Sequence, residues 1–169
     1  KYQEICPIIK YNLNKFNLGA EKNIELGVQF AKHKYLWILG DDDHIERGGL
    51  KVITNELIKD FPCLILNYSV WDAKMEKKTK SKKFNINKDL NLKQDNVMKV
   101  FGPHLGFISM LVIDIELLKL GFKECKNTPL ITPGWPLLAS VYCGLKHTTS
   151  CSKFLHKPIL RNRSGNAHL

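Results

Sequence analysis

Three consecutive carboxylates, Asp41, Asp42 and Asp43, are the residues of this sequence whose type and spacing best suit chemistry. They follow an apolar run over residues 35–40, and three adjacent negative charges repel one another. A hard divalent cation relieves that repulsion, because Mg²⁺ and Mn²⁺ prefer oxygen ligands and take one or two protein carboxylates together with substrate phosphates. The triplet therefore predicts a divalent-metal site.

A purely structural role for the triplet is the alternative, and the residues alone leave it open. An Asp before a helix accepts backbone N–H bonds and lies favourably at the positive helix end, and Arg47 could neutralise another carboxylate. A calcium loop of the EF-hand type is excluded, because Ile45 and Val52 fall where such a loop, counted from Asp41, requires oxygen ligands.

The elements that would position the triplet alternate between strands and helices. Apolar runs predict strands at 6–11, 34–40 and 63–71, and a helical spacing of apolar residues predicts helices at 18–31 and 48–58. This order is typical of an α/β fold with a mainly parallel sheet, in which ligands bind beyond the carboxyl ends of the strands. The triplet directly follows the second of these strands.

The second half of the chain predicts shorter elements within the same single domain, residues 1–169. Gly27 lies on the apolar face of the first predicted helix, where it either weakens that helix or marks close packing against the sheet. The further predictions are a helix at 96–101, a strand at 107–114, helices at 115–120 and 137–145, and a final strand at 154–160.

The net charge of +10 favours anionic partners. Seven lysines gather in the segment 73–88, which predicts a solvated or mobile loop. Only three of the 26 basic residues are arginines, which argues against a specific nucleic-acid reader. An enzyme that works beside an anionic membrane leaflet would also benefit from such a charge.

The cysteines and the apolar runs indicate the compartment. Five cysteines without a C-x-x-C pair argue against a disulfide framework and fit a reducing cytoplasm, with Cys63 and Cys143 as small core residues. No apolar run approaches the ~20 residues of a membrane span. We therefore expect a cytoplasmic protein, in peripheral contact with the inner face of a membrane.

The loop Asn17–Asn23, the run 35–43 and the segment Gly48–Leu50 stand in an order that resembles a family 2 glycosyltransferase of the GT-A type. The resemblance implies a Rossmann-like, mixed and mainly parallel sheet flanked by helices. It is close from about residue 7 to residue 57, and weaker similarity continues in Gly106–Ser109 and in the closing segment 157–166.

The resemblance implies a nucleotide-sugar donor, Mg²⁺ or Mn²⁺, and inverting transfer to a glycan or lipid-linked acceptor in surface polysaccharide biosynthesis. By position, Asp41 would lie near the donor's ribose or sugar and contact the metal, Asp42 would assist, and Asp43 would be the principal metal ligand. Gly19 would let the backbone turn close to the donor. Asn23 would either contact the nucleotide or only fix a neighbouring loop.

The general base and the acceptor site are less defined. The acidic pair that supplies the base in many relatives is absent, although 120–124 resembles the segment before it. His104 is one candidate base because histidine titrates near neutrality, and Glu124 and Asp114 are others. Trp135 would stack on an acceptor sugar or serve as a packing anchor.

The family pattern normally begins with about two further strand–helix units, including a base-binding Asp. We therefore expect an N-terminally incomplete sheet whose open edge favours self-association as a homodimer. Arg161 and Arg163 would meet the diphosphate or remain solvated. The alternatives to an active transferase are a catalytically silent remnant, a basic nucleic-acid-binding domain and a nucleotidyltransferase.

Overall fold

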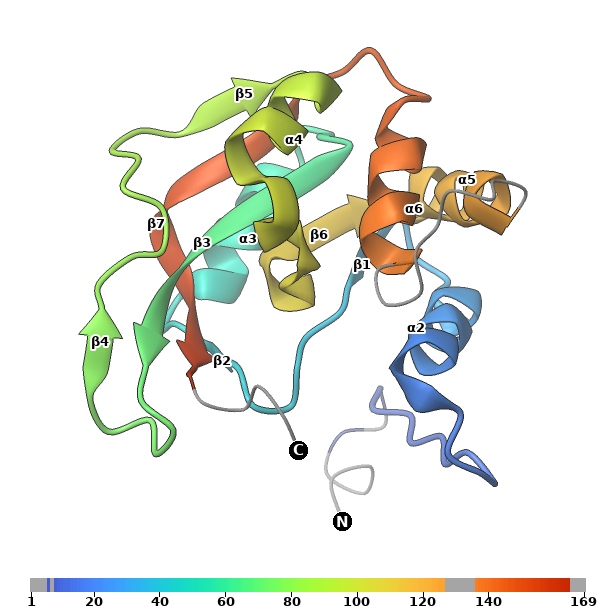
Figure 1. Cartoon of the computed structure of the whole chain (residues 1–169), viewed down its shortest axis with the longest axis horizontal. Coiled ribbons are helices and arrows are strands. Elements are labelled where there is room, and N and C mark those ends of the chain that lie inside the picture. The colour runs from blue at the N-terminus through green and yellow to red at the C-terminus, as the bar shows by residue number, and fades with distance from the viewer. Residues whose placement is uncertain (1–5, 7, 127–135, 165–169) are drawn as a thin grey trace.

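The computed structural model describes residues 6, 8–126 and 136–164, which form a mixed α/β fold around one seven-stranded sheet (Figure 1). The strands are β1 (Tyr35–Trp37), β2 (His44–Ile45), β3 (Cys63–Trp71), β4 (Lys78–Lys80), β5 (Leu90–Leu92), β6 (Leu111–Asp114) and β7 (Ser152–Arg163). The helices are α2 (Gly19–Phe30), α3 (Gly49–Leu57), α4 (Gln94–Phe101), α5 (Ile115–Lys126) and α6 (Pro136–Leu145), with 3₁₀ helices η1 (Gly102–Gly106) and η2 (Ile108–Met110). The prediction of an α/β fold is confirmed.

The sheet is mixed in direction, and the expectation of a mainly parallel sheet is not confirmed. Its strand order is β1-β6-β3-β7-β2, with β4 added beside β3 and β5 beside β7. Among the described strands, β3 and β7 pair in parallel and the other pairings are antiparallel. Parallel neighbours require a long crossover connection, usually a helix. No helix lies between β3, β4 and β5 along the chain, so these short strands do not extend the parallel part of the sheet.

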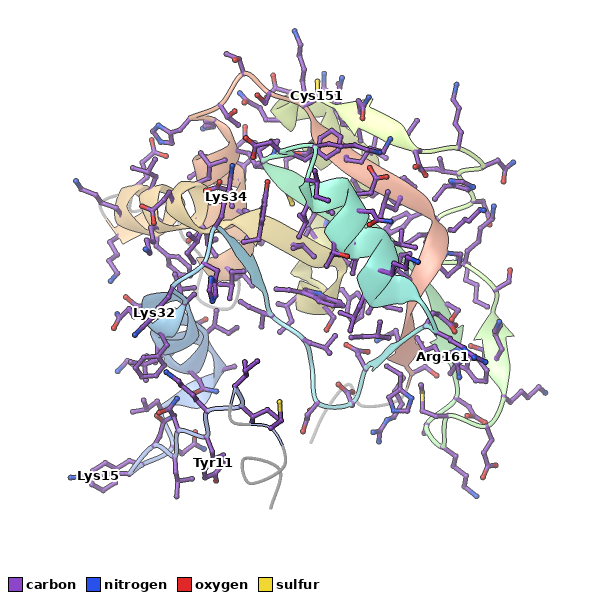
Figure 2. All side chains as sticks on the ribbon, turned by 180° about the vertical axis from the view of Figure 1, so that it is seen from behind. Tyr11, Lys15, Lys32, Lys34, Cys151 and Arg161 are labelled. Atoms are coloured by element: carbon purple, nitrogen blue, oxygen red, sulfur yellow. The ribbon has the colours of Figure 1, made fainter. Side chains whose placement is uncertain are left out.

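Helices cover both faces of the central strand β3. Figure 1 shows α4 in front of β3 and β7 with α3 behind them, and Figure 2 shows α3 from the other side. The first seven residues of β3 are buried, as its unbroken apolar run predicts for a strand covered on both faces. The prediction of a strand at 63–71 is therefore confirmed, and this strand fixes the frame that the site is built on.

Helices α5 and α6 pack with their backbones in contact. A Cβ atom on Gly121 would lie 1.8 Å from the carbonyl oxygen of Ser140, and one on Gly144 would lie 2.2 Å from the carbonyl oxygen of Leu117. Such an approach is possible only because both positions lack a side chain. Gly121 belongs to the segment 120–124, which resembles the one before the acidic pair of many relatives. In this structure Gly121 has a packing role.

A bulge in β7 is held in place by side chains from two neighbouring segments. The register between β3 and β7 shifts at Asn67, so the residues of β7 around His156 bulge out of the ladder. The fully buried Asn67 amide donates to the carbonyl oxygens of His156 and Phe84 at 2.8 and 2.9 Å. Bulges bend the strand that contains them, and this one precedes the part of β7 that reaches the candidate site.

Asp89 should make stability depend on pH at this bulge. Its Oδ1 accepts the backbone N–H of His156 at 3.0 Å and lies 2.6 Å from the Nδ1 of that ring, while Oδ2 lies 3.6 Å from the Nζ of Lys153. Burial alone would raise the pKa of Asp89, but these bonds and charges together lower it. The stabilisation is therefore complete above the ordinary pKa and is lost as pH falls through the lowered one.

Urea unfolding of the wild type and of Asp89→Asn measures this effect. We expect the wild type to be the more stable protein at about pH 5 and the difference to shrink towards about pH 2. A difference that stays constant over that range would contradict the assigned role of the carboxylate.

Several predicted elements are corrected by the structure. The strand predicted at 6–11 is not formed by residues 8–11, whose apolar side chains are exposed and have no neighbouring strand in the described part of the chain. The loop predicted at 73–88 includes β4, which pairs with the end of β3. Close packing at Gly27 is also wrong, because a Cβ atom there would meet nothing within 4 Å. Within the described residues, no helix has both the length and the apolar character needed to cross a bilayer.

Candidate functional site

The acidic triplet lies at the edge of the sheet where three strands end. Strands β1 and β3 both run antiparallel to β6, and β3 runs parallel to β7, so β1, β3 and β7 share one direction. Their carboxyl ends meet at the lower edge of the sheet in Figure 1, where the chain leaves β1 towards β2. Ligands of open α/β sheets bind at this edge.

Asp43 is anchored inside this edge by bonds from two distant segments. Only 8% of its surface is exposed. Its Oδ2 accepts the hydroxyl of Ser109 at 2.6 Å, and its Oδ1 accepts the amide of Asn162 at 3.2 Å. The backbone N–H of Arg163 also bonds to this carboxylate. The buried charge is therefore compensated by donors, as a buried carboxylate requires.

Ser109 also holds the loop that presents the triplet. Its fully buried hydroxyl accepts the backbone N–H of Gly40 at 2.9 Å while it donates to Asp43, and its carbonyl oxygen accepts the Nε1–H of Trp37 at 2.7 Å. A side chain at Gly40 would be crowded, because its Cβ would lie 3.0 Å from carboxylate oxygens of both Asp42 and Asp43. These contacts fix the backbone of 40–43 against η2.

The pKa of Asp43 is raised, first by burial and also by the neighbouring charge of Asp42. The bonds from Ser109, Asn162 and the backbone of Arg163 act in the opposite direction and favour the carboxylate. The charge of Asp43 adds to burial in raising the pKa of Tyr68, a buried residue of β3, to about 12. Tyr68 therefore remains a neutral phenol beside the acidic loop.

Asp41 is the carboxylate of the triplet that is available to a ligand. It is exposed and has no hydrogen-bond or ion-pair partner among the described residues, whereas both oxygens of Asp43 already accept bonds. In the described part of the chain, no three His, Cys, Asp or Glu side chains are grouped so that they could hold a metal ion. A cation that takes one carboxylate and substrate phosphates fits Asp41; a cage of three carboxylates does not fit this loop.

Two arginines of β7 add positive charge to the same edge. Arg161 donates to Glu46 at 2.8 Å and its guanidinium lies 4.9 Å from the centre of the Trp71 ring. The bond to Glu46 raises the pKa of Arg161. The Nε atoms of Arg161 and Arg163 are buried without a hydrogen-bond partner in the described structure. Neither arginine lies in a purely solvated tail.

Helix α2, which contains the predicted donor residues Gly19 and Asn23, lies apart from this edge (Figure 1). Gly19 begins α2 with a φ of +75°, and its N–H bonds to Asn17 Oδ1 at 2.9 Å, so the glycine serves the turn into the helix. Asn23 accepts the amide of Asn14 at 2.9 Å. Of the two roles considered for Asn23, fixing a neighbouring loop is the one this bond supports.

The three candidate bases have different surroundings, and Asp114 accepts the backbone N–H groups of Glu116 and Leu117 at the start of α5. The ring of His104, in η1, packs edge-on to Phe84 at 5.5 Å, and Phe84 packs on Tyr68 at 6.2 Å, so His104 is connected to the site through two aromatic rings. Burial lowers the pKa of His104, and Lys83 and Lys80 lower it further. Glu124 instead lies on α5, 3.3 Å from His147.

Trp135, the predicted acceptor residue, lies outside the described residues. Sequence reasoning did not assign a role to Ser109, Asn162 or Tyr68. A signal for the first two was present, since both fall in the weaker stretches of resemblance, Gly106–Ser109 and 157–166. The structure brings these stretches together at Asp43.

Comparison with known proteins leaves the chain without an assigned family. No protein-family model matches the sequence, and no curated protein matches it significantly. The function is therefore inferred from the residues and their geometry.

Proposed function

We propose that this chain contains a glycosyltransferase site that moves a sugar from a nucleoside-diphosphate donor to a glycan or lipid-linked acceptor. One observation carries the proposal: at the carboxyl edge of the sheet, Asp43 accepts hydrogen bonds from both Ser109 and Asn162, and the three residues come from separate stretches that resemble family 2 glycosyltransferases. A chance similarity of sequence gives no reason for these stretches to meet at one carboxylate.

The donor would bind across the exposed side of the acidic loop. Asp43 positions the loop, and Asp41, which is exposed, contacts the metal and the ribose or sugar. Mg²⁺ or Mn²⁺, when bound, would neutralise charge on the diphosphate leaving group. The positive charge of Arg163, next to Asn162 on β7, supports a diphosphate at this edge.

The acceptor hydroxyl needs a base, and His104 suits that role better than Glu124. Its lowered pKa keeps the imidazole neutral and able to take a proton near pH 7. As the acceptor oxygen forms its bond to the anomeric carbon, the bond from that carbon to the phosphate oxygen breaks. His104 receives the proton and the nucleoside diphosphate leaves, so the configuration at the anomeric carbon inverts.

The lysines of 73–88 support an acceptor at an anionic membrane surface. Lys74, Lys77, Lys80 and Lys83 are not ion-paired with any described carboxylate, although Lys78 lies over the Trp71 ring. Because Trp71 ends β3, this basic segment lies beside the same edge as the proposed donor site. A lipid-linked acceptor would therefore be presented close to the donor.

Calorimetric binding of nucleoside diphosphates in the presence of Mn²⁺ tests the donor site. We expect one nucleotide to bind with a metal requirement, and Asp41→Asn to weaken it by about tenfold or more, since a charge-assisted contact is worth about 1.5–3 kcal/mol. The matched control is Asp95→Asn, which changes an exposed carboxylate in the first turn of α4 and should bind as the wild type does.

Release of free nucleoside diphosphate from a panel of sugar nucleotides tests the chemistry. We expect release with the donor whose nucleotide binds, and its loss in His104→Gln at unchanged nucleotide affinity. Binding without any release, with added glycan and lipid-linked acceptors, would favour a catalytically silent remnant. Absence of binding to every nucleotide would overturn the proposed function.

A further inference from the structure

A pocket of about 330 Å³ lies between helices α2, α5 and α6, beside the β1 edge of the sheet (Figure 1). Its lining residues are Glu21, Lys22 and Glu25 of α2, Phe122, Cys125 and Lys126 of α5, and Ser140 of α6. We propose that this pocket binds a small, uncharged aromatic molecule that carries one N–H or O–H group. The acidic triplet takes no part in it, so the proposal does not depend on the transferase function.

Ser140 supplies a polar group that the fold leaves without a partner. The residue is fully buried, and its hydroxyl oxygen has no hydrogen-bond partner among the described residues. Buried polar side chains are in most cases hydrogen-bonded, because an unmade bond leaves the cost of removing the group from water uncompensated. Since Ser140 also lines the pocket, a polar atom of a ligand is a suitable partner for its hydroxyl.

The close packing of α5 on α6 fixes the position of this serine. The two helices touch through their backbones at Gly121, where an added Cβ would lie 1.8 Å from the carbonyl oxygen of Ser140. Cys125 follows Gly121 by four residues and so lies on the same face of α5. The polar group and one apolar wall of the pocket are therefore presented by two tightly packed helices, which lowers the ordering cost of binding.

The remaining walls favour an aromatic ring. Phe122 is partly buried and offers its own ring for offset or edge-to-face packing. Cys125 is buried and behaves as a small apolar group. An apolar cavity of about 150 Å³ is large enough for benzene. A pocket of about 330 Å³ therefore has room for a two-ring molecule such as indole.

The charges of the lining favour an uncharged ligand. Its acidic residues, Glu21 and Glu25, are matched in number by its basic residues, Lys22 and Lys126. Lys126 pairs with Glu25 and so joins α5 to α2 beside the pocket. Long basic side chains can also cover apolar surface with their methylene groups while the ammonium group stays in water. A charged ligand would gain no net attraction from this lining.

Titration of the full chain with indole, followed by its amide resonances, tests the pocket. Indene is the matched probe, because it has the shape of indole without the N–H group. We expect shifts at 121–126 and 137–141, with indole bound about three- to tenfold more tightly than indene, since a neutral hydrogen bond contributes about that factor. Ser140→Ala should remove the preference. Its Tm without ligand should be no lower than that of the wild type, because the lost hydroxyl makes no bond in the described structure.

A second pair of variants tests the aromatic wall. Phe122→Leu should weaken the binding of indole and of indene alike, because it removes the ring against which both would pack. The matched control is Phe30→Leu, which changes an exposed ring of α2 outside the lining and should leave both affinities unchanged.

Three results would overturn the proposal. Equal affinities for indole and indene, or a preference that persists in Ser140→Ala, would show that the hydroxyl is not the group recognised. Shifts outside the three helices would show that the probes bind elsewhere. An absence of shifts with either probe would mean that water alone occupies the pocket.

Discussion

Gly121→Ala is expected to destabilise the protein by about 3 kcal/mol or more, among the larger effects of adding one methyl group. The added Cβ would lie 1.8 Å from the carbonyl oxygen of Ser140 and 2.8 Å from the backbone nitrogen of Gly144. Both are backbone atoms, so the two helices must separate rather than a side chain turn aside. At roughly 2–4 °C per kcal/mol, Tm should fall by about 10 °C.

Gly27→Ala makes the same chemical change with the opposite expected sign. Gly27 lies inside α2, is exposed, and has nothing within 4 Å of an added Cβ. Alanine should stabilise this helix by up to about 1 kcal/mol, because it restricts the unfolded chain and favours the helix. Chemical unfolding of both variants beside the wild type decides the matter: equal stabilities for the two would contradict the close packing of α5 on α6.

Ser109→Ala should cost on the order of 3 kcal/mol of unfolding free energy. The change removes the hydroxyl that donates to the buried Asp43 and leaves the N–H of Gly40 without its acceptor. A hydrogen bond to a charged group contributes about 1.5–3 kcal/mol, and an orphaned buried donor costs a further amount of about 1–3 kcal/mol. The matched control is Ser81→Ala, which removes an exposed hydroxyl and should be close to neutral.

The loss in Ser109→Ala should also depend on pH. Asp43 has a raised pKa in the folded protein, so stability falls as pH rises from the unfolded pKa through the folded one. Removal of the Ser109 donor raises that folded pKa further. The variant should therefore lose more unfolding free energy near neutral pH than in acid, where Asp43 is protonated in both the folded and the unfolded state. Unfolding at both pH values measures this, and a pH-independent loss would mean that Asp43 is not the group affected.

The fold could be predicted from sequence wherever an element is long and strongly patterned. The strand at 63–71 and the helix at 18–31 match β3 and α2, because a continuous apolar run and a helical spacing are visible without the tertiary structure. A strand of two residues such as β2 has no readable period, and it forms only because β7 lies beside it. The mixed direction of the strands was also not predicted, because β6, the antiparallel partner of β1 and β3, comes late in the chain.

The candidate site could be predicted only in part. The acidic triplet was identified because three adjacent carboxylates are conspicuous in any sequence. The bonds from Ser109 and Asn162 were not, because each joins residues that are 66 or more positions apart. Without those partners the sequence could not show that Asp43 is the buried anchor of the loop and Asp41 its exposed carboxylate.

Paramagnetic broadening by Mn²⁺ tests most directly whether the carboxyl edge of β1, β3 and β7 holds a metal and a diphosphate. Amide resonances would be recorded during titration with Mn²⁺ and the nucleoside diphosphate that binds. Broadening falls off steeply with distance from the ion, so the amides affected locate it without reference to activity.

We predict early broadening at 40–44, around Ser109 and at Arg161–Arg163, with reversal by a chelator and attenuation in Asp41→Asn. Another group of carboxylates provides the contrast: Asp60, Asp114 and Glu116 line a pocket of about 270 Å³ beside the first residues of β3, at the opposite end of that strand. Broadening at that pocket first, or at no defined position, would contradict the assignment of the donor site to the acidic triplet.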